Sequence, residues 1–225
     1  MTAGFRIARR TRSVTAPQIA GFRGIPVANV SDCMSRMTAG GARLRPVHAS
    51  GSMAGPALTV RTRPGDNLMV HRALDMAEPG DIIVVDAGGD LANAIIGELM
   101  QSHALQRRVG GMVINGAVCD VAALRAGRLP VFAAGVTHRG PYKDGPGEIN
   151  VPVAFDGMVV TPGDLVIGDE DGFLCVPFDQ VDAVHAAAMA KQAAEAVQMA
   201  EILAGTSDRR WVEASLRRLG CDIED

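Results

Sequence analysis

Two carboxylates, Glu98 and Asp120, flank a segment whose layout can hold a metal ion. Apolar residues recur every three or four positions from Leu91 to Leu105, and Glu98 lies among them. This spacing predicts a helix packed on a core. Gly110 and Gly111 are expected to end that helix, because glycine is common just past a helix C-terminus. The first carboxylate is therefore expected on a helix.

The second carboxylate follows a predicted buried strand. Met112-Val113-Ile114 is a short continuous apolar run, as expected for a strand covered on both faces, and Asn115-Gly116 is expected to end it. Asp120 then lies beyond the end of a strand, where open α/β sheets usually bind their ligands. The alternative is that Asp120 caps a helix from Val121 to Gly127, since aspartate is a preferred N-cap residue.

The composition fits one large α/β domain, because 225 residues with 48% hydrophobic side chains can bury a sizeable core. The net charge is -3 and basic residues cluster only in pairs, so we expect no nucleic acid partner. No apolar run approaches a membrane span and no signal peptide core is visible, so we expect no membrane contact and a cytoplasmic protein. The cysteines are scattered and expected to be free thiols: Cys33, Cys119, Cys175 and Cys221.

Helices and strands are expected to alternate in the first half of the chain, and short strands to dominate most of the second half. Ser31-Asp32 is expected to open a helix that Gly40-Gly41 closes. The remaining predicted helices cover 67–77 and 180–203, and the predicted strands cover 57–62, 81–86, 129–133, 151–155, 158–160, 165–168 and 173–176. The phrase Pro-Gly-Asp occurs three times, which we interpret as turn chemistry without a duplicated domain.

Three parts are expected along the chain: an N-terminal arm over residues 1–24, an α/β domain over 25–205 and a C-terminal extension over 206–225. The helix that contains Ala186 to Ala200 is rich in small residues. It is expected to pack closely either on a neighbouring subunit or on its own sheet.

Several short phrases follow one another in a fixed order between Val27 and Gly205. They are Arg63-Pro64-Gly65-Asp66-Asn67, Pro79-Gly80-Asp81, Val85-Asp86, Gly88-Gly89, Gly97-Glu98, Gly116-Ala117-Val118-Cys119-Asp120, Val151-Pro152-Val153, Pro162-Gly163-Asp164 and Asp169-Glu170-Asp171-Gly172. In their order and spacing the chain resembles the RraA-like family, which includes the class II 4-hydroxy-4-methyl-2-oxoglutarate aldolases. The resemblance implies a swivelling β/β/α fold and assembly into homotrimers or homohexamers.

The resemblance also implies a site. Aldolases of this family carry an acidic residue, twenty intervening residues and then Arg-Asp, which here correspond to Glu98 and to Cys119-Asp120. Asp120 is then expected to hold Mg²⁺ or Mn²⁺, which favour oxygen ligands. Glu98 and Glu195, the latter from a neighbouring subunit, are expected to orient waters on that ion. Glu195 is otherwise an ordinary solvent-facing helix residue.

Two backbone amides and two side chains are expected to bind the substrate. The backbone amides of Leu99 and Met100, after Gly97, are expected to bind its carboxylate, unless they make ordinary helical hydrogen bonds. Asn67 and His71 share one helical face and are expected to point into the cleft.

The departure from the family pattern lies at Cys119, because a thiol cannot replace the charged, planar fork of arginine. Cys119 is interpreted either as a small apolar filler or as a reactive thiol or soft ligand. The candidates for a replacement charge are Arg107, Arg108 and Arg125, although the expected place of each is the protein surface.

The predicted function is a metal-dependent lyase that releases pyruvate from a 4-hydroxy-2-oxo dicarboxylate such as 4-hydroxy-4-methyl-2-oxoglutarate. Oxaloacetate decarboxylation is the expected side activity. The alternative is a non-catalytic regulator that binds a protein partner such as a ribonuclease. The chain lacks the glycine-rich nucleotide loop that a methyltransferase would carry.

Overall fold

The centre of the molecule is a run of parallel strands in the order β3-β4-β6-β7. A helix lies in each of the three connections between successive strands of this run and returns the chain to the same end of the sheet, as parallel strands require. The computed structural model describes residues 3–38 and 40–224. The bounds are β3 (Met53–Thr62), α3 (Leu68–Met76), β4 (Ile82–Asp86), α4 (Glu98–Gln106), β6 (Gly111–Val118), α5 (Val121–Ala126) and β7 (Val131–Val136).

Alternating side chains of the central strands build two separate cores, because successive residues of a strand face opposite sides of a sheet. On β4, Ile83 and Val85 pack beneath α3, α4 and α5. Ile82 and Val84 face the other way, toward a second layer of β structure that includes Phe173. A strand buried on both faces is continuously apolar, which is why β4 was recognisable in the sequence.

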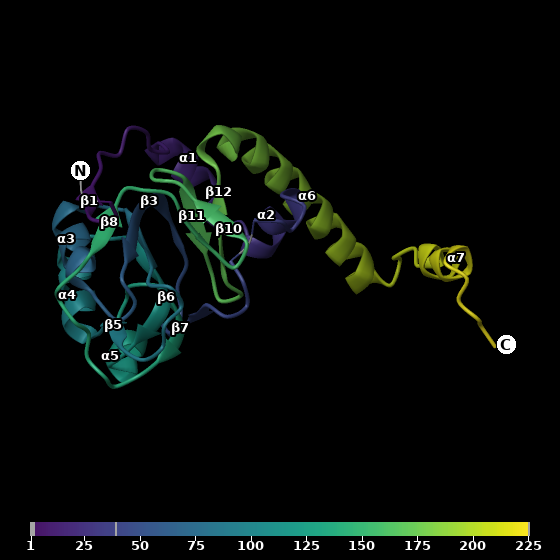
Figure 1. Ribbon diagram of the computed structural model, residues 1–225. Helices are drawn as coiled ribbons and strands as arrows, with labels where there is room; N and C mark the ends of the chain where they lie inside the picture. Colours follow the sequence, from purple (N-terminus) through teal and green to yellow (C-terminus); the bar gives the residue numbers. More distant parts are fainter. Residues whose placement is uncertain (1–2, 39, 225) are drawn as a thin grey trace. The chain divides into compact units, whose positions relative to one another are not determined.

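The second layer consists of β11 (Leu165–Gly168) and β12 (Phe173–Val176), which pair antiparallel with each other and attach to β3, and of the hairpin β9 (Val153–Phe155) and β10 (Met158–Val160). Its outer face is covered by α1 (Ala16–Gly21), α2 (Val27–Cys33) and the first turns of α6 (Val181–Ala204). The layers are therefore helix, sheet, sheet and helix (Figure 1). This α/β architecture confirms the predicted fold class.

Short strands complete the large sheet at its edges. They are β1 (Arg6–Ile7) on β8 (Gly147–Ile149), β8 on β3, β2 (Arg45–Pro46) on β7 and β5 (Ala94–Ile96) on β6. At the centre of the second core, the ring of Phe132 is fully buried and packs on Phe173, with centroids 5.5 Å apart.

The chain divides into two compact units, Met1–Ala188 and Met189–Asp225. The second unit contains the remainder of α6 and the helix α7 (Arg210–Arg218). Its Trp211 is the chain's single tryptophan, and its side chain is 62% exposed. Among the described residues, no helix combines the length and apolar character needed to cross a bilayer. Residues 1, 2 and 225 of the expected arm and extension lie outside the described residues, and the expected limits stay a prediction.

Two elements near the expected site differ from the sequence prediction. The helix expected from Leu91 begins only at Glu98, because Ala94–Ile96 pairs with β6 and Gly97 is extended. The strand expected to end at Asn115-Gly116 continues to Val118 across a register shift. Both differences come from pairing between β5 and β6, which local periodicity does not record.

The helix expected after Ser31-Asp32 was also placed wrongly. It begins at Val27, whose backbone amide donates to the carboxylate of Asp169 at 2.9 Å. That cap comes from 142 residues further along the chain, so the local sequence carries no sign of it.

Candidate functional site

The site is built where β5 and β6 end side by side and α4 and α5 begin. Asp120 adopts the left-handed conformation, with φ 55° and ψ 40°, directly after β6. Its carboxylate Oδ2 accepts a hydrogen bond from the Glu98 amide at 2.9 Å. Asp120 thus satisfies the first free amide of α4, one of the donors that a helix start leaves without a partner.

The alternative in which the Asp120 side chain caps the helix that follows it is wrong. Asp120 is the N-cap residue of α5 by position, but among the described residues its carboxylate makes no capping bond to that helix. The carboxylate reaches back to α4 instead. Its orientation is therefore fixed by the neighbouring element.

Gly97 allows this approach because it has no side chain. A Cβ at position 97 would overlap Oδ2 of Asp120 and Sγ of Cys119. The backbone of Gly97 is extended, so the requirement is one of space and does not arise from a left-handed conformation.

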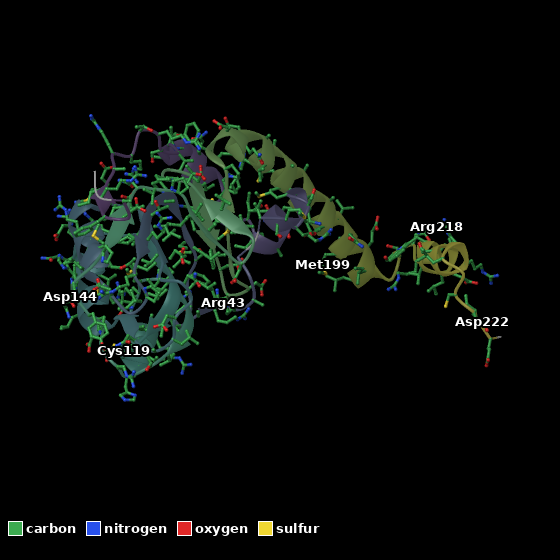
Figure 2. The ribbon with its side chains drawn as sticks, in the orientation of Figure 1. Arg43, Cys119, Asp144, Met199, Arg218 and Asp222 are labelled. Carbon is green, nitrogen blue, oxygen red and sulfur yellow. The ribbon has the colours of Figure 1, made fainter. Side chains whose placement is uncertain are left out.

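A pocket of about 220 Å³ opens beside this junction. The residues proposed from the sequence that line it are Asn67, His71, Gly97, Leu99, Met100, Cys119 and Asp120. Cys119 lies at the edge of the α/β unit where these strands end (Figure 2). The Glu98 side chain is exposed and does not contribute to the lining, although its amide binds Asp120.

Asn67 supplies the pocket with a buried acceptor that lacks a donor. Its side chain is 3% exposed, and its Nδ2 donates to the carbonyl of Ile95 at 2.9 Å and contacts Sδ of Met100 at 3.2 Å. Its Oδ1 has no hydrogen-bond partner among the described residues. An unsatisfied buried acceptor costs about 1–3 kcal/mol, so a ligand that donates to Oδ1 would recover that free energy.

His71 lies one turn after Asn67 on α3 and is partly buried. Burial lowers the pKa of His71, and the positive charge of Lys143 and the nearby His103 lower it further, while Asp75 opposes them. The imidazole is therefore neutral at pH 7 and keeps one nitrogen free to accept a proton.

Cys119 is held in the protonated form. Burial raises the pKa of its thiol, and the adjacent carboxylate of Asp120 raises it further. Its amide donates to the carbonyl of Ile96 at 3.0 Å, and its Sγ contacts the same oxygen at 3.6 Å. A protonated thiol is a poor nucleophile, which favours the interpretation as a small filler.

The arginines proposed to replace the missing charge do not line the pocket within the described part of the chain. Arg107 instead binds the backbone carbonyls of Asp75 and Ala77. The cation that does line the pocket is Lys143. Sequence reasoning missed it because the turn-rich stretch around Lys143 has no apolar period, and its position depends on distant residues.

Glu195 lies on α6 in the second unit, where its carboxylate pairs with Lys191 at 2.9 Å. Its expected role in a neighbouring subunit stays a prediction. Within residues 3–38 and 40–224, no group of three or more His, Cys, Asp or Glu side chains is arranged so that these side chains alone could hold a metal ion. One carboxylate, completed by waters and substrate oxygens, suits Mg²⁺, which usually keeps several of its waters. The residues present therefore fit such an ion at Asp120.

The comparison with known proteins supports the resemblance. The family model described as RraA-like, Aldolase/RraA, matches residues 27–175, which include β3 to β11, all but the last residue of β12, and the whole pocket. The chain belongs to the RraA-like family. Its relative from Halalkalibacterium halodurans, named "Putative 4-hydroxy-4-methyl-2-oxoglutarate aldolase", is 39% identical over 175 residues, 78% of this chain and 83% of that protein.

Solved structures share the RraA-like fold. The RNA-processing inhibitor RraA of Thermus thermophilus has a TM-score of 0.63 and 30% identity, covering 68% of this chain and 92% of that one. An uncharacterised protein from Pseudomonas syringae pv. tomato has a TM-score of 0.78 with 22% identity, over 87% of this chain and 96% of that one. The family thus contains proteins named as aldolases and proteins named as inhibitors.

Proposed function

We propose that this RraA-like protein is a divalent-metal-dependent lyase. It releases pyruvate from a 4-hydroxy-2-oxo dicarboxylate such as 4-hydroxy-4-methyl-2-oxoglutarate, and decarboxylates oxaloacetate as a side activity. The observation that carries the proposal is the meeting of Asp120, Asn67 and the cation Lys143 at one small pocket. The name of the Halalkalibacterium halodurans relative supports the same reaction.

Asp120 is the residue that would hold Mg²⁺ or Mn²⁺, with Glu98 next to it and Glu195 contributed by a second copy in a homotrimer or homohexamer. The ion supplies Lewis-acid stabilisation of the charge that develops on the 2-oxo acid. The hydrogen bond from the Glu98 amide holds the carboxylate of Asp120 in one orientation.

The pocket binds the rest of the substrate through backbone and side-chain groups. Since α4 begins at Glu98, the amides of Leu99 and Met100 lie in its first turn, where a helix offers them no acceptor. They are available for a carboxylate, and Lys143 adds a positive charge that attracts an anionic substrate to the pocket. The Oδ1 atom of Asn67 is left to accept a hydrogen bond from a water bound in the pocket beside the substrate.

Breaking the bond between C3 and C4 requires that the 4-hydroxyl lose its proton and that C3 gain one. Neutral His71 lines the pocket and is suited to accept the hydroxyl proton, and the imidazolium that forms is suited to return a proton to C3. The loss of the family arginine is expected to lower the rate by on the order of 10²–10³ relative to an aldolase that retains it.

The test is pyruvate release from 4-hydroxy-4-methyl-2-oxoglutarate and from oxaloacetate, with Mg²⁺, with Mn²⁺ and with chelator. Wild type is expected to release pyruvate only with metal, Asp120→Ala to lose this activity, and Cys119→Arg to gain rate. Asp90→Ala is the matched control, because Asp90 also accepts one backbone amide, at 3.2 Å from Ala92, but lies outside the pocket. Release that survives both chelation and Asp120→Ala would refute the proposal.

A second function is favoured by the likeness to the RNA-processing inhibitor of Thermus thermophilus, which is 30% identical. In that case the chain would bind a ribonuclease and need no metal. This second function is favoured over the lyase if no variant releases pyruvate and if wild type, with chelator present, inhibits RNA cleavage by an RNase E-type ribonuclease.

A further inference from the structure

The three Pro-Gly-Asp turns, 64–66, 79–81 and 162–164, have the same backbone. Their glycines have φ values of 75°, 92° and 85°, a left-handed conformation that glycine adopts without strain. In each, the aspartate amide donates at 3.0 Å to the carbonyl three residues earlier. The three aspartates are nearly or fully buried. The turns therefore offer an internal comparison of what each carboxylate does.

Two of the carboxylates close their own turn. Asp81 accepts the amide of Glu78 at 2.9 Å, and Asp164 accepts the amide of Thr161 at 2.9 Å. Asp66 differs, because the corresponding amide of Arg63 donates elsewhere, to the carbonyl of Pro146. The carboxylate of Asp66 is thus released from the local turn.

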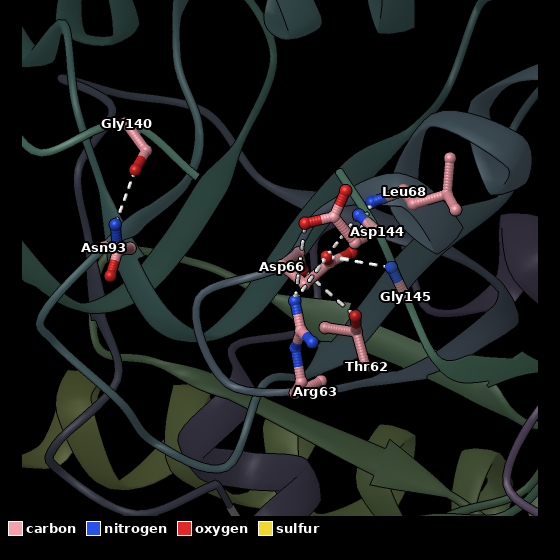
Figure 3. Close-up of polar contacts among 8 residues, drawn as sticks. All are labelled: Thr62, Arg63, Asp66, Leu68, Asn93, Gly140, Asp144 and Gly145. Carbon is pink, nitrogen blue, oxygen red and sulfur yellow. Dashed lines mark hydrogen bonds and ion pairs between the residues drawn. The ribbon is translucent and has the colours of Figure 1, made fainter. Parts of the chain in front are cut away.

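Asp66 uses its carboxylate across the fold. Its Oδ2 accepts the amides of Asp144 at 2.7 Å and Gly145 at 2.9 Å, and the guanidinium of Arg63 at 3.2 Å. Its Oδ1 accepts the amide of Leu68 at 2.9 Å, at the start of α3 (Figure 3). Asp66 is 0% exposed, so these bonds form away from water. Amide bonds to a carboxylate are among the stronger ones in proteins.

The segment that Asp66 binds carries Lys143, and we call residues 139–146 the clamped loop. Tyr142 directly precedes Lys143. Its amide donates to the carbonyl of Gly65 at 2.8 Å, and its carbonyl accepts from the amide of Asn67 at 3.0 Å. Asp144, on the other side, is held by Asp66. At the start of the loop, the side chain of Asn93 donates to the carbonyl of Gly140 (Figure 3). Both neighbours of Lys143 are therefore fixed to the turn that precedes Asn67.

We propose that Asp66 is a positioning residue, which holds the clamped loop so that Lys143 stays at the pocket and sets its affinity for an anionic substrate. The inference rests on the proposed function of that pocket. Asp66 touches no substrate, so it acts only through Lys143. The turn 64–66 thus directly precedes Asn67 and also anchors the loop that carries Lys143.

The variant to test is Asp66→Asn, which keeps the shape of the side chain but replaces one acceptor oxygen by an NH₂ group. Its single remaining oxygen cannot accept both the loop amides and the amide of Leu68, and the negative charge that strengthens these bonds is gone. We expect KM for pyruvate release to rise about tenfold with kcat nearly unchanged, because a charge that binds ground state and transition state alike affects KM. Asp164→Asn is the matched control, since Asp164 is also buried and amide-bound but lies away from the pocket.

A double-mutant cycle separates positioning from a general structural effect. In a Lys143→Met background, Asp66→Asn is expected to cause no further rise in KM, because the group it positions is gone. An equal rise in both backgrounds, or an equal rise for Asp164→Asn in the wild-type background, would overturn the inference.

Amide hydrogen exchange tests the clamp without any reaction. Exchange at Asp144 and Gly145 is expected to quicken at least tenfold in Asp66→Asn, and to stay at the wild-type rate in Asp164→Asn. Unchanged protection in Asp66→Asn would overturn the clamp. If wild type releases no pyruvate, the proposed function fails, and the exchange result alone then decides whether Asp66 holds the loop.

Discussion

The Oδ2 atom of Asp120 lies 2.9 Å from the amide nitrogen of Glu98, so the residue that starts α5 also completes the start of α4. Two helices therefore meet at one residue, and its carboxylate bonds to the start of α4. The bond fixes the rotation of that carboxylate. The proposed metal ligand is therefore already oriented before an ion binds. The absence of a side chain at Gly97 makes the bond sterically possible.

Gly97→Ala is expected to abolish metal-dependent pyruvate release, because the added methyl group would displace Asp120 and Cys119. Affinity for Mn²⁺, measured by calorimetry, is expected to fall at least tenfold. Gly140→Ala is the control, since a Cβ there meets open space. Wild-type metal affinity in Gly97→Ala would show that the Asp120 geometry is unimportant.

Asn67→Ala is expected to lower kcat/KM by about tenfold, because it removes a buried hydrogen-bond acceptor at the pocket, and one hydrogen bond contributes about 0.5–1.5 kcal/mol. Asn150→Ala is the matched control: Asn150 also has a buried Oδ1 without a partner among the described residues, but it lies outside the pocket. Steady-state kinetics on both variants decide the matter. Equal losses of kcat/KM in the two variants would show that Asn67 has no specific role in the pocket.

His71 is expected to make stability depend on pH. Its pKa is lowered in the folded state by burial, Lys143 and His103, so below the ordinary value of 6.5 the unfolded chain binds a proton that the folded chain resists. Stability is therefore lost as pH falls below 6.5 toward the folded pKa.

Urea unfolding followed by circular dichroism at about pH 7.5 and about pH 5.5 measures this effect. Wild type is expected to lose more stability over that interval than His71→Gln, because other groups titrate alike in both. Identical losses would contradict the lowered pKa.

Phe132→Ala is expected to destabilise the first unit by about 3–5 kcal/mol, the usual cost of emptying a buried aromatic site. Phe132 is fully buried between His48 and Phe173. Val159→Ala, at a side chain 58% exposed, is the control and is expected to change stability by less than about 0.5 kcal/mol. Urea unfolding measures both, and a small effect at Phe132 would show that the second core relaxes around the cavity.

The sequence predicted those elements whose own residues carry the pattern. The run Ile82–Asp86 is apolar because β4 is buried on both faces, and Leu68–Met76 keeps a helical period because one side packs on the sheet. Ala94–Ile96 was mistaken for helix, because three apolar residues fit either period. Its strand conformation depends on pairing with β6 and on the bond from the Ala94 amide to Arg139.

The same division applies to the site. Asn67, His71 and the stretch Gly97 to Met100 could be placed because they follow one another on or beside regular elements. Lys143 could not, since a turn-rich loop has no period and takes its position from Asp66, 77 residues earlier.

The single tryptophan and the single tyrosine of this chain make its intrinsic fluorescence a local signal. Trp211, 62% exposed on α7, belongs to the second unit and reports on it. Tyr142 lies on the clamped loop, with its ring 6.0 Å from the guanidinium of Arg63. Tyrosine emission from a Trp211→Phe variant would therefore follow the clamped loop, which carries Lys143.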